Sequence, residues 1–299
     1  MASTGEDARA TSCASAISDR RPQKRSRARG RVPRASRLYR SGSRQYNSAM
    51  LKPTLLSCAA VMAAALLLVL VPAAARGADA ADPAAPVVLF NGRDLSGWLF
   101  RNAALKASWK VVSEVKLSES DPQQLVGIGE GGADDAVLFR VPTDHGSDIY
   151  TRQEFGDCEL EIEFMVPRGS NSGVYLMGRY ELQILDSYGK TGRLGMGDCG
   201  AIYSASVPST NATRPPGQWQ KFEVVFRAPR FDQSGRKIEN ARFVSVKLNG
   251  TVIQENVQVK GPTGGELSST ERPTGPILLQ GDHGVVAFRN VRVRPVAIE

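Results

Sequence analysis

Residues 158–166 read CELEIEFMV, and the three glutamates of this stretch alternate with leucine, isoleucine and phenylalanine. A two-residue period of this kind is typical of a strand with one buried and one solvated face. Farther along the chain the period recurs in QKFEVVFRAP (220–229), ARFVSVKLNGTVIQENV (241–257) and GPILLQGDHGVVAFRNVRVRP (275–295). The second of these contains Asn249-Gly250, a dipeptide that favours a tight hairpin turn. We therefore expect one strand in 220–229 and two in each of the longer stretches.

Turn-forming residues separate these stretches, as in 92–94 (GRD) and 215–217 (PPG), and no long amphipathic helix is evident. Many strands without alternating helices favour an antiparallel sandwich over a parallel sheet. The prediction is an all-β, antiparallel jelly-roll sandwich with a concave face. An antiparallel sheet can bury one face and present the other to a ligand.

Residues 171–187, NSGVYLMGRYELQILDS, mix core residues with hydrogen-bonding groups. Interpreted as one strand, the stretch places four odd positions on one side: Tyr175, Arg179, Glu181 and Gln183. Leu182 and Ile184 then take the other side, and a bulge near Gly178 would shift this phase. The pattern predicts that the polar side is the face presented to a ligand.

Several catalytic motifs are absent from the sequence, among them a P-loop, a Rossmann glycine pattern, HExxH, CxxC and GxSxG. His145 and His283 are the two histidines of the chain, so a site with three histidines on zinc is excluded. Laminarinase-type β-glucanases place three acids as E-x-D-x-E on one strand, where this chain has Glu181, Gln183 and Leu185. Because two of the acids are missing, double-displacement glycoside hydrolysis on this strand is disfavoured.

The chain resembles the 3-keto-disaccharide hydrolase family, also described as the 3-keto-glucoside-1,2-lyase and 3-keto-2-hydroxy-glucal hydratase domain. The resemblance lies in LFNGRDLSGW (89–98), FGDCELEIEFMVPRGSNSGVYLMGRYELQILDS (155–187), GAIYS (200–204), RPPGQWQKFEVVFRAPRFD (214–232), LNG (248–250) and the stretch 275–295. It implies a jelly roll similar to concanavalin-like lectins and glucanases, export from the cytoplasm, and action on sugars oxidised at C3.

The implied chemistry needs one base rather than a carboxylate nucleophile. A ketone at C3 acidifies the hydrogen on C2, its removal gives an enolate, and the glycosidic oxygen leaves C1; water then adds to the glucal. We expect Glu181 or His283 to be the base and the other to be the acid, with Arg179 stabilising negative charge. The residues expected to hold the sugar are Asn171, Tyr175, Gln183, Tyr203 and Gln280, and Asp186 is expected to bind sugar or a metal. No cofactor is certain; a divalent metal ion could polarise the ketone, although no motif demands one.

Two alternatives to an enzyme remain open at this point: a non-catalytic carbohydrate-binding domain and a structural, lectin-like module of the cell envelope. A binding domain would retain sugar without consuming it. If the protein is an enzyme, its substrate is a 3-keto sugar made by a separate oxidoreductase.

The basic charge of the chain belongs to its beginning. The formal net charge is +8, but residues 1–52 hold 13 Lys and Arg against 3 Asp and Glu, which leaves −2 for the remainder. This distribution argues against a nucleic-acid partner. We expect 1–49 to be a disordered, Arg-rich extension, with Met50 as an alternative start.

Residues 50–81 have the layout of a secretory signal peptide: Lys52, an apolar run over 59–71, and small residues after it. The run has 13 residues, whereas a helix that spans a bilayer needs about 20. The prediction is a periplasmic or extracellular protein that meets the membrane only through its signal peptide; an uncleaved anchor is the alternative.

Residues 82–299 are then expected to form one domain. This part contains Cys158 and Cys199. Two cysteines in an exported protein allow one disulfide bridge, and two free buried thiols are the alternative.

Overall fold

The structure is a computed structural model that describes residues 85–299. The predicted extension and signal peptide lie outside these residues. The described part is almost entirely β-structure, and every strand pair in it is antiparallel. Within 85–299, no helix combines the length and the apolar character needed to cross a membrane.

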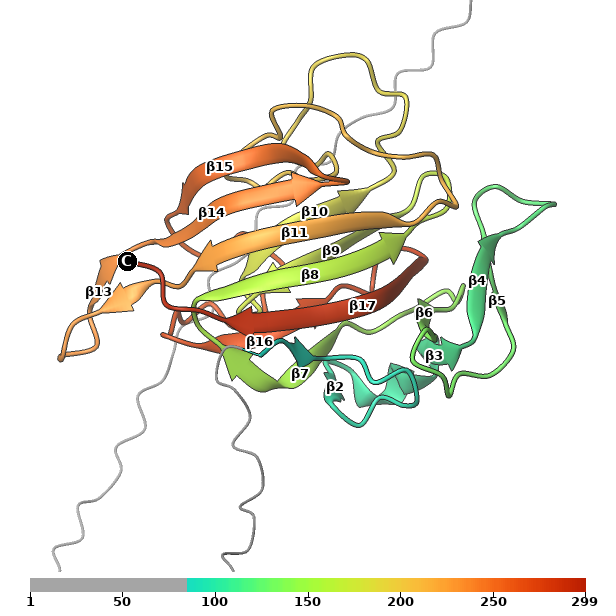
Figure 1. Cartoon of the computed structure of the whole chain (residues 1–299), viewed down its shortest axis with the longest axis horizontal. Helices are drawn as coiled ribbons and strands as arrows, with labels where there is room; N and C mark the ends of the chain where they lie inside the picture. The colour runs from blue at the N-terminus through green and yellow to red at the C-terminus, as the bar shows by residue number, and fades with distance from the viewer. Residues whose placement is uncertain (1–84) are drawn as a thin grey trace, which may run out of the picture. The chain divides into compact units, whose positions relative to one another are not determined.

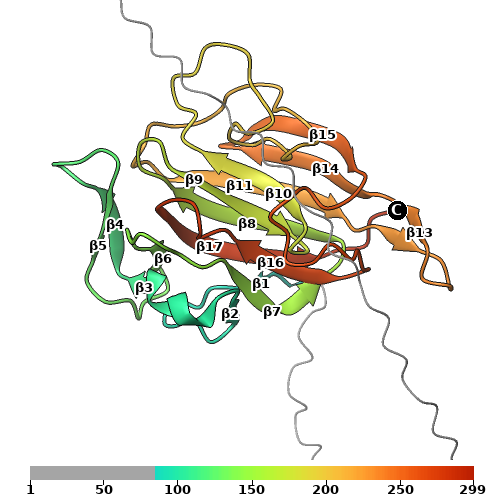
Figure 2. The ribbon, with the colours of Figure 1, turned by 180° about the vertical axis from the view of Figure 1, so that it is seen from behind.

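Two sheets stack on one another (Figure 1). The larger sheet has eight strands, in the order β15 (Thr251–Val259), β14 (Ala241–Leu248), β11 (Gln220–Arg227), β8 (Cys158–Met165), β17 (Val286–Pro295), β6 (Val137–Arg140) and β3 (Trp109–Val112), with β1 (Val87–Val88) paired to β17. The smaller sheet has five strands, in the order β10 (Tyr180–Leu185), β9 (Asn171–Leu176), β16 (Gly275–Leu279), β7 (Ile149–Phe155) and β2 (Trp98–Phe100). Figure 2 shows the five-stranded sheet from behind. The predicted antiparallel sandwich is confirmed.

Smaller elements complete the described chain. Two separate ribbons are formed by β4 (Glu114–Leu117) with β5 (Leu125–Ile128) and by β12 (Arg230–Phe231) with β13 (Lys237–Glu239). A short 3-10 helix, η1 (Ala103–Ser108), follows β2.

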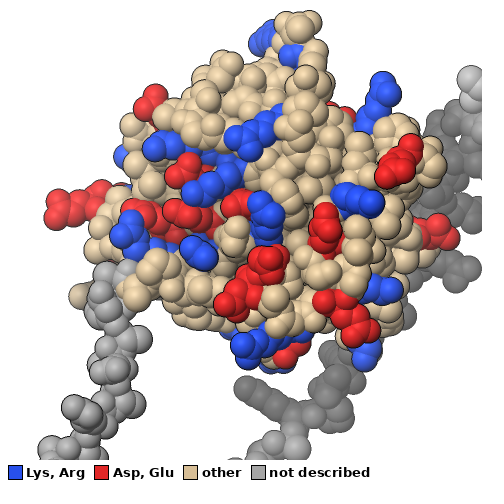
Figure 3. Space-filling view, turned by 45° about the vertical axis from the view of Figure 1, so that its right-hand side comes forward, with Lys and Arg blue, Asp and Glu red and all other residues tan. Residues whose placement is uncertain are grey.

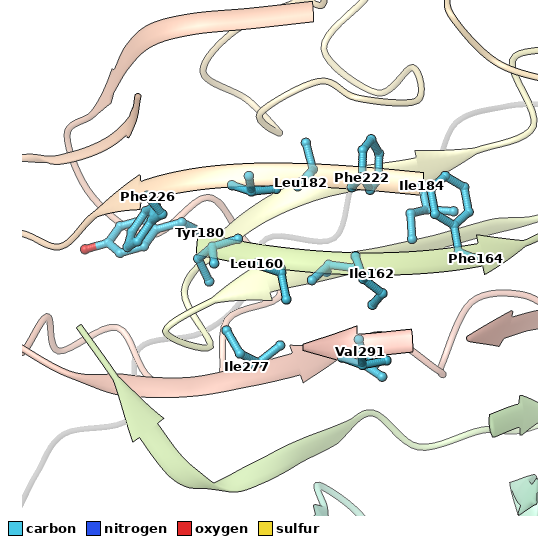
Figure 4. Close-up of a cluster of buried hydrophobic side chains, with 14 of the residues drawn as sticks. Leu160, Ile162, Phe164, Tyr180, Leu182, Ile184, Phe222, Phe226, Ile277 and Val291 are labelled. Atoms are coloured by element: carbon cyan, nitrogen blue, oxygen red, sulfur yellow. The ribbon is translucent and has the colours of Figure 1, made fainter. Parts of the chain in front are cut away.

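The alternation in β8 determines how the two sheets pack. Leu160, Ile162 and Phe164 point into the core and are almost completely buried there against Leu182 and Ile184 of β10 (Figure 4). The glutamates between them point outward, and two pair with arginines of β17: Glu159 with Arg294 and Glu163 with Arg289. Figure 3 shows positive and negative side chains interspersed on the visible face. Burial of the apolar row stabilises the sandwich by roughly 25 cal/mol per Å² of apolar surface removed from water.

The prediction that 171–187 forms one strand is wrong, because the chain reverses in its middle. Met177 and Gly178 both have positive φ, 57° and 62°, which is the backbone of a tight hairpin turn. The Arg179 amide donates to the Leu176 carbonyl at 3.1 Å and closes the turn. The stretch therefore forms two neighbouring strands, β9 and β10.

The other turn and strand predictions agree with the structure. Asn249-Gly250, with φ of 54° and 85°, connects β14 to β15 as expected. Residues 275–295 form the two expected strands, β16 and β17, which belong to different sheets. Cys158 and Cys199 are buried free thiols, so the alternative of a bridge between them is excluded.

Candidate active site

A cavity of about 230 Å³ opens on the outer face of the five-stranded sheet. Seven of the nine site residues predicted from the sequence line it. These are Asn171, Tyr175, Glu181, Gln183, Tyr203, Gln280 and His283, and Gly264 and Gly265 complete the lining. The predicted cluster therefore exists, with two exceptions described below.

The hairpin brings the central residues of this cavity together. Glu181 lies directly opposite Tyr175 in the pairing of β10 with β9, and Gln183 lies opposite Gly173. Residues directly opposite in an antiparallel pair share a face, so Tyr175, Glu181 and Gln183 all point outward. Their neighbours Leu182 and Ile184 are fully buried on the core side. Gln280 follows β16, and its backbone amide donates to the Gly173 carbonyl at 2.9 Å.

Glu181 is a carboxyl group with 4% of its residue surface exposed. Burial is the main cause that raises its pKa, from the usual 4.5 to about 7. The Tyr175 hydroxyl, which is hydrogen-bonded to the carboxylate, and the charge of His283 act in the opposite direction, while Asp148 and Asp282 raise the pKa further. A group with this pKa can accept a proton near neutral pH.

The Glu181 carboxylate needs the empty space above Gly173. A Cβ atom at position 173 would lie 2.4 Å from Glu181 Oε1, far inside contact distance. Gly173 has ordinary strand backbone and is not among the positive-φ glycines, so a larger residue here would act through space alone, by displacing the Glu181 side chain.

Three side-chain amide oxygens in the cavity lack partners. Asn171 Oδ1, Gln183 Oε1 and Gln280 Oε1 are buried and accept no hydrogen bond from residues 85–299. Buried polar atoms in folded proteins are nearly always paired, and unpaired ones call for a ligand or water. Each can accept a hydrogen bond from a hydroxyl group. Three such acceptors beside one carboxyl group suit a ligand rich in hydroxyls.

His283 lies at the mouth of the cavity in an exposed turn. Its Nδ1 is hydrogen-bonded to Asp282 Oδ1, which leaves Nε2 for a ligand. The turn is anchored from inside the protein at Gly281. The Gly281 amide donates to Asp148 Oδ1 at 2.9 Å, and Arg140 Nε donates to the Gly281 carbonyl at 2.7 Å.

Residues 261–274, called the strap here, form the opposite wall. Its Thr263 amide donates to the Arg179 carbonyl at 3.0 Å, and its Leu267 amide donates to the Gly178 carbonyl at 2.9 Å. Arg101 Nη1 donates both to the Gly265 carbonyl at 2.8 Å and to Asp148 Oδ2 at 3.1 Å. The strap is therefore tied to the hairpin and to the same Asp148 that anchors the His283 turn.

Sequence reasoning missed Gly264, Gly265, Asp148 and Arg101. The sequence showed a Gly-Gly dipeptide here, and the structure explains it: a Cβ at Gly265 would lie 2.6 Å from the Tyr175 hydroxyl, and the φ of Gly265 is +68°. Arg101 and Asp148 carry no local signal, since each acts through partners that are distant in the sequence.

Contrary to the prediction, Arg179 does not line this cavity with Glu181. It follows the hairpin turn, where the two-residue period is interrupted, and its side chain lines a different cavity. Arg179 Nε donates to the Thr270 carbonyl at 2.8 Å and Nη1 to the Met177 carbonyl at 2.7 Å. Its guanidinium therefore holds the strap and the turn together.

Asp186 also lies outside the lining. Its Oδ2 accepts from the Gly169 amide at 2.9 Å and its Oδ1 from the Tyr188 amide at 3.3 Å. These bonds fix two loops, as expected of a short acid in a turn. In residues 85–299, no group of three or more His, Cys, Asp or Glu side chains is placed to hold a metal ion.

Comparison with known proteins agrees with this geometry. Residues 85–294 match the family described as the 3-keto-alpha-glucoside-1,2-lyase-like domain. A search of curated proteins found no match.

The chain is similar to a number of solved structures, among them the following three. A candidate glycosyl hydrolase from Parabacteroides distasonis is 30% identical, with a TM-score of 0.52 over 71% of this chain and 84% of that one. A second from the same organism is 19% identical, with a TM-score of 0.47 over 71% and 94%. A carbohydrate-binding module, CBM66 from Bacillus subtilis, is 11% identical, with a TM-score of 0.35 over 68% and 98%.

Proposed function

The chain belongs to the 3-keto-alpha-glucoside-1,2-lyase-like family, and on that premise we propose that it is an exported enzyme that cleaves 3-keto-glycosides by elimination. The observation that carries this proposal is the cavity itself. One buried carboxyl group with a pKa of about 7 lies beside three buried amide oxygens that lack partners. The carboxyl group suits proton removal near neutral pH, and the unpaired amide oxygens suit the hydroxyl groups of a sugar.

Glu181 is the base in this mechanism. It takes the proton from C2, the electrons of the C–H bond form the enolate with the C3 ketone, and the enolate then expels the oxygen on C1. The product sugar has a C1–C2 double bond and retains the C3 ketone. The burial that raises the pKa of Glu181 makes it a stronger base than an ordinary carboxylate, which lowers the barrier to this step.

His283 is the acid that protonates the departing oxygen. It lies at the exposed mouth, where an aglycone can leave, whereas Glu181 lies in the buried part. The hydrogen bond between Nδ1 and Asp282 orients the ring so that Nε2 can deliver the proton. Addition of water to C1, with return of a proton to C2, would complete a net hydrolysis.

Arg179 has no part in stabilising the enolate in this proposal, because it lines another cavity. The amide nitrogens of Asn171 and Gln183 take that role, since both side chains line the site and can donate. The substrate carries a ketone, so an oxidoreductase acting on C3 of the sugar must supply it.

The full chain should be incubated with α- and β-linked 3-keto-glucosides in deuterium oxide and followed by NMR. Release of the aglycone with a glucal signal or deuterium at C2 is expected. Glu181→Gln should lower kcat by a factor of at least 100, since general bases contribute about 10²–10⁴-fold. Glu255→Gln, a change on exposed β15, is the matched control and should retain full activity.

A non-catalytic carbohydrate-binding protein is the second candidate, and the three unpaired amide oxygens suit it equally. This candidate gives no role to the raised pKa of Glu181. Sugar binding without turnover on any 3-keto-glucoside, with divalent metal ions present or absent, would overturn the enzyme in favour of this reading.

A further inference from the structure

A second cavity, of about 300 Å³, lies on the same face of the five-stranded sheet. Tyr150 of β7 lines it, and Tyr150 lies opposite Leu278 of β16, which in turn lies opposite Tyr175 of the candidate active site. The strap separates the two cavities: Gly264 and Gly265 line the first, and Leu267 lines the second. The volume of the second cavity is at the lower end of the usual range for small-molecule sites, about 300–1,000 Å³.

Three arginines and one acid give the second cavity a positive charge. Arg152, Arg179 and Arg272 line it together with Glu154. Within residues 85–299, none of the three arginines forms an ion pair with a carboxylate. Glu154 accepts a hydrogen bond from Thr274 Oγ1 at 2.7 Å instead. Among the described residues, therefore, none of the three guanidinium groups is in contact with a carboxylate, and Glu154 offsets only part of their charge.

Arg179 is the buried member of these three arginines. Only 5% of its residue surface is exposed, and its Nη2 donates to no atom of residues 85–299, although Nε and Nη1 are both engaged. A buried cation without a counter-charge is costly, and a carboxylate that accepts from Nη2 would offset that cost. The carbonyl bonds of Arg179 hold the guanidinium in place, so the cost of ordering it has already been met by folding.

The rest of the lining is largely apolar; Thr151 and Ser268 add two hydroxyl groups, and no amide side chain is present. Leu99, Tyr150, Leu267 and Pro276 supply carbon surface, and neither asparagine nor glutamine is present. The candidate active site differs, because three amides line it. Flat apolar surface beside guanidinium groups suits an aromatic ring that carries a carboxylate, and arginine also stacks on aromatic faces.

We propose that this cavity is a binding site for an aromatic carboxylate, with the ring against Tyr150 and Pro276 and the carboxylate against the arginines. Two sources have this chemistry: a free aromatic acid, and the aromatic aglycone of a glycoside whose sugar occupies the first cavity. The site goes beyond the proposed function, because binding of the acid requires no turnover.

Benzoate titrated into the full chain by calorimetry tests the site, with benzamide as the neutral isostere. Benzoate should bind at least tenfold more tightly than benzamide, and its affinity should fall as salt is added. The double variant Arg152→Ala/Arg272→Ala should weaken benzoate at least tenfold. Both side chains are exposed, so this variant should fold. Arg292→Ala, an exposed arginine of β17 in the other sheet, is the matched control and should bind benzoate as the wild type does.

Equal affinities for benzoate and benzamide, no benzoate binding, or unchanged binding by the double variant would each overturn the proposal. The source of the acid is tested with 4-carboxyphenyl and phenyl β-glucosides. If the acid is an aglycone, the carboxyl group should tighten glucoside binding at least tenfold, and the double variant should abolish this gain. If the acid is free, benzoate should bind with the same affinity when phenyl glucoside is saturating.

Discussion

Replacing Glu181 by glutamine should stabilise the protein at alkaline pH. The pKa of this carboxyl group is raised in the folded state from 4.5 to about 7, chiefly by burial. The folded protein therefore holds a proton between these values that the unfolded chain releases, and the free energy of unfolding falls as pH rises through this range. Above pH 7 the folded protein has to bury a charge.

The size of the effect follows from the shift. At about 1.4 kcal/mol per pKa unit, the ionised carboxyl group costs roughly 3 kcal/mol of stability above pH 7. Glu181→Gln removes the charge while keeping a similar shape, so it should be up to about 3 kcal/mol more stable than the wild type at pH 8.5. Below pH 4.5 the two proteins should be nearly equal, because the wild-type side chain is then neutral in both states.

Urea unfolding from pH 4 to pH 8.5 measures this difference. Since m-values in urea are about 1–3 kcal/mol/M, the midpoints should separate by about 1 M or more at the alkaline end. Glu255→Gln controls for loss of an acidic side chain on an exposed strand position. A constant difference between Glu181→Gln and the wild type across the whole pH range would refute the reasoning, because the native Glu181 would then hold no extra proton.

Three further predictions concern the same cavity. Gly173→Ala should lower kcat at least tenfold, because its Cβ would displace the Glu181 carboxylate from a position 2.4 Å away. Gln183→Leu should raise KM for the sugar about tenfold, since it removes an unpaired buried oxygen that can accept from a sugar hydroxyl, and should also lower kcat, since it removes an amide nitrogen assigned to the enolate; urea unfolding should show no loss of stability. Tyr175→Phe should move the rise of kcat/KM with pH to higher pH, because the lost hydrogen bond normally lowers the pKa of Glu181.

Each of these has a contrary outcome. Gly192→Ala is the control for Gly173→Ala, since its Cβ would meet no atom within 4 Å, and equal activity of the two variants would contradict the steric argument. An unchanged KM in Gln183→Leu would show that the amide does not contact the sugar. A pH–rate profile of Tyr175→Phe that moves to lower pH would reverse the assigned role of the hydroxyl group.

Much of the site could be predicted because a strand exposes its pattern in a two-residue period. Glu181 and Gln183 share a face within β10, and Leu182 and Ile184 share the opposite one, as local alternation requires. The predicted face of Tyr175 was correct, although the prediction of a single strand over 171–187 was wrong. The three-residue connection between Leu176 and Tyr180 places odd positions of β9 opposite odd positions of β10.

Arg179 shows where local reasoning fails. By its odd number it belongs beside Glu181, yet the turn at Met177 and Gly178 rotates it into the neighbouring cavity. Asp186, likewise, follows the end of β10, and its carboxylate is used by backbone amides nearby. For Arg179, the backbone geometry of the turn overrode the alternation on which the prediction depended; for Asp186, nearby backbone amides use the carboxylate that was expected to bind sugar or a metal.

The sequence by itself determined the strands within 158–166, 220–229, 241–257 and 275–295, the buried face of β8 and the polar row of β10, because these depend on the order of neighbouring residues. Only the tertiary structure decided that Asp148 anchors the His283 turn, that Arg101 ties Asp148 to the strap, and that a second cavity with three arginines lies beside the first. Those contacts join segments more than 40 residues apart in the chain. They exist because β7, β16 and β9 pair side by side, and no local period of the sequence encodes that pairing.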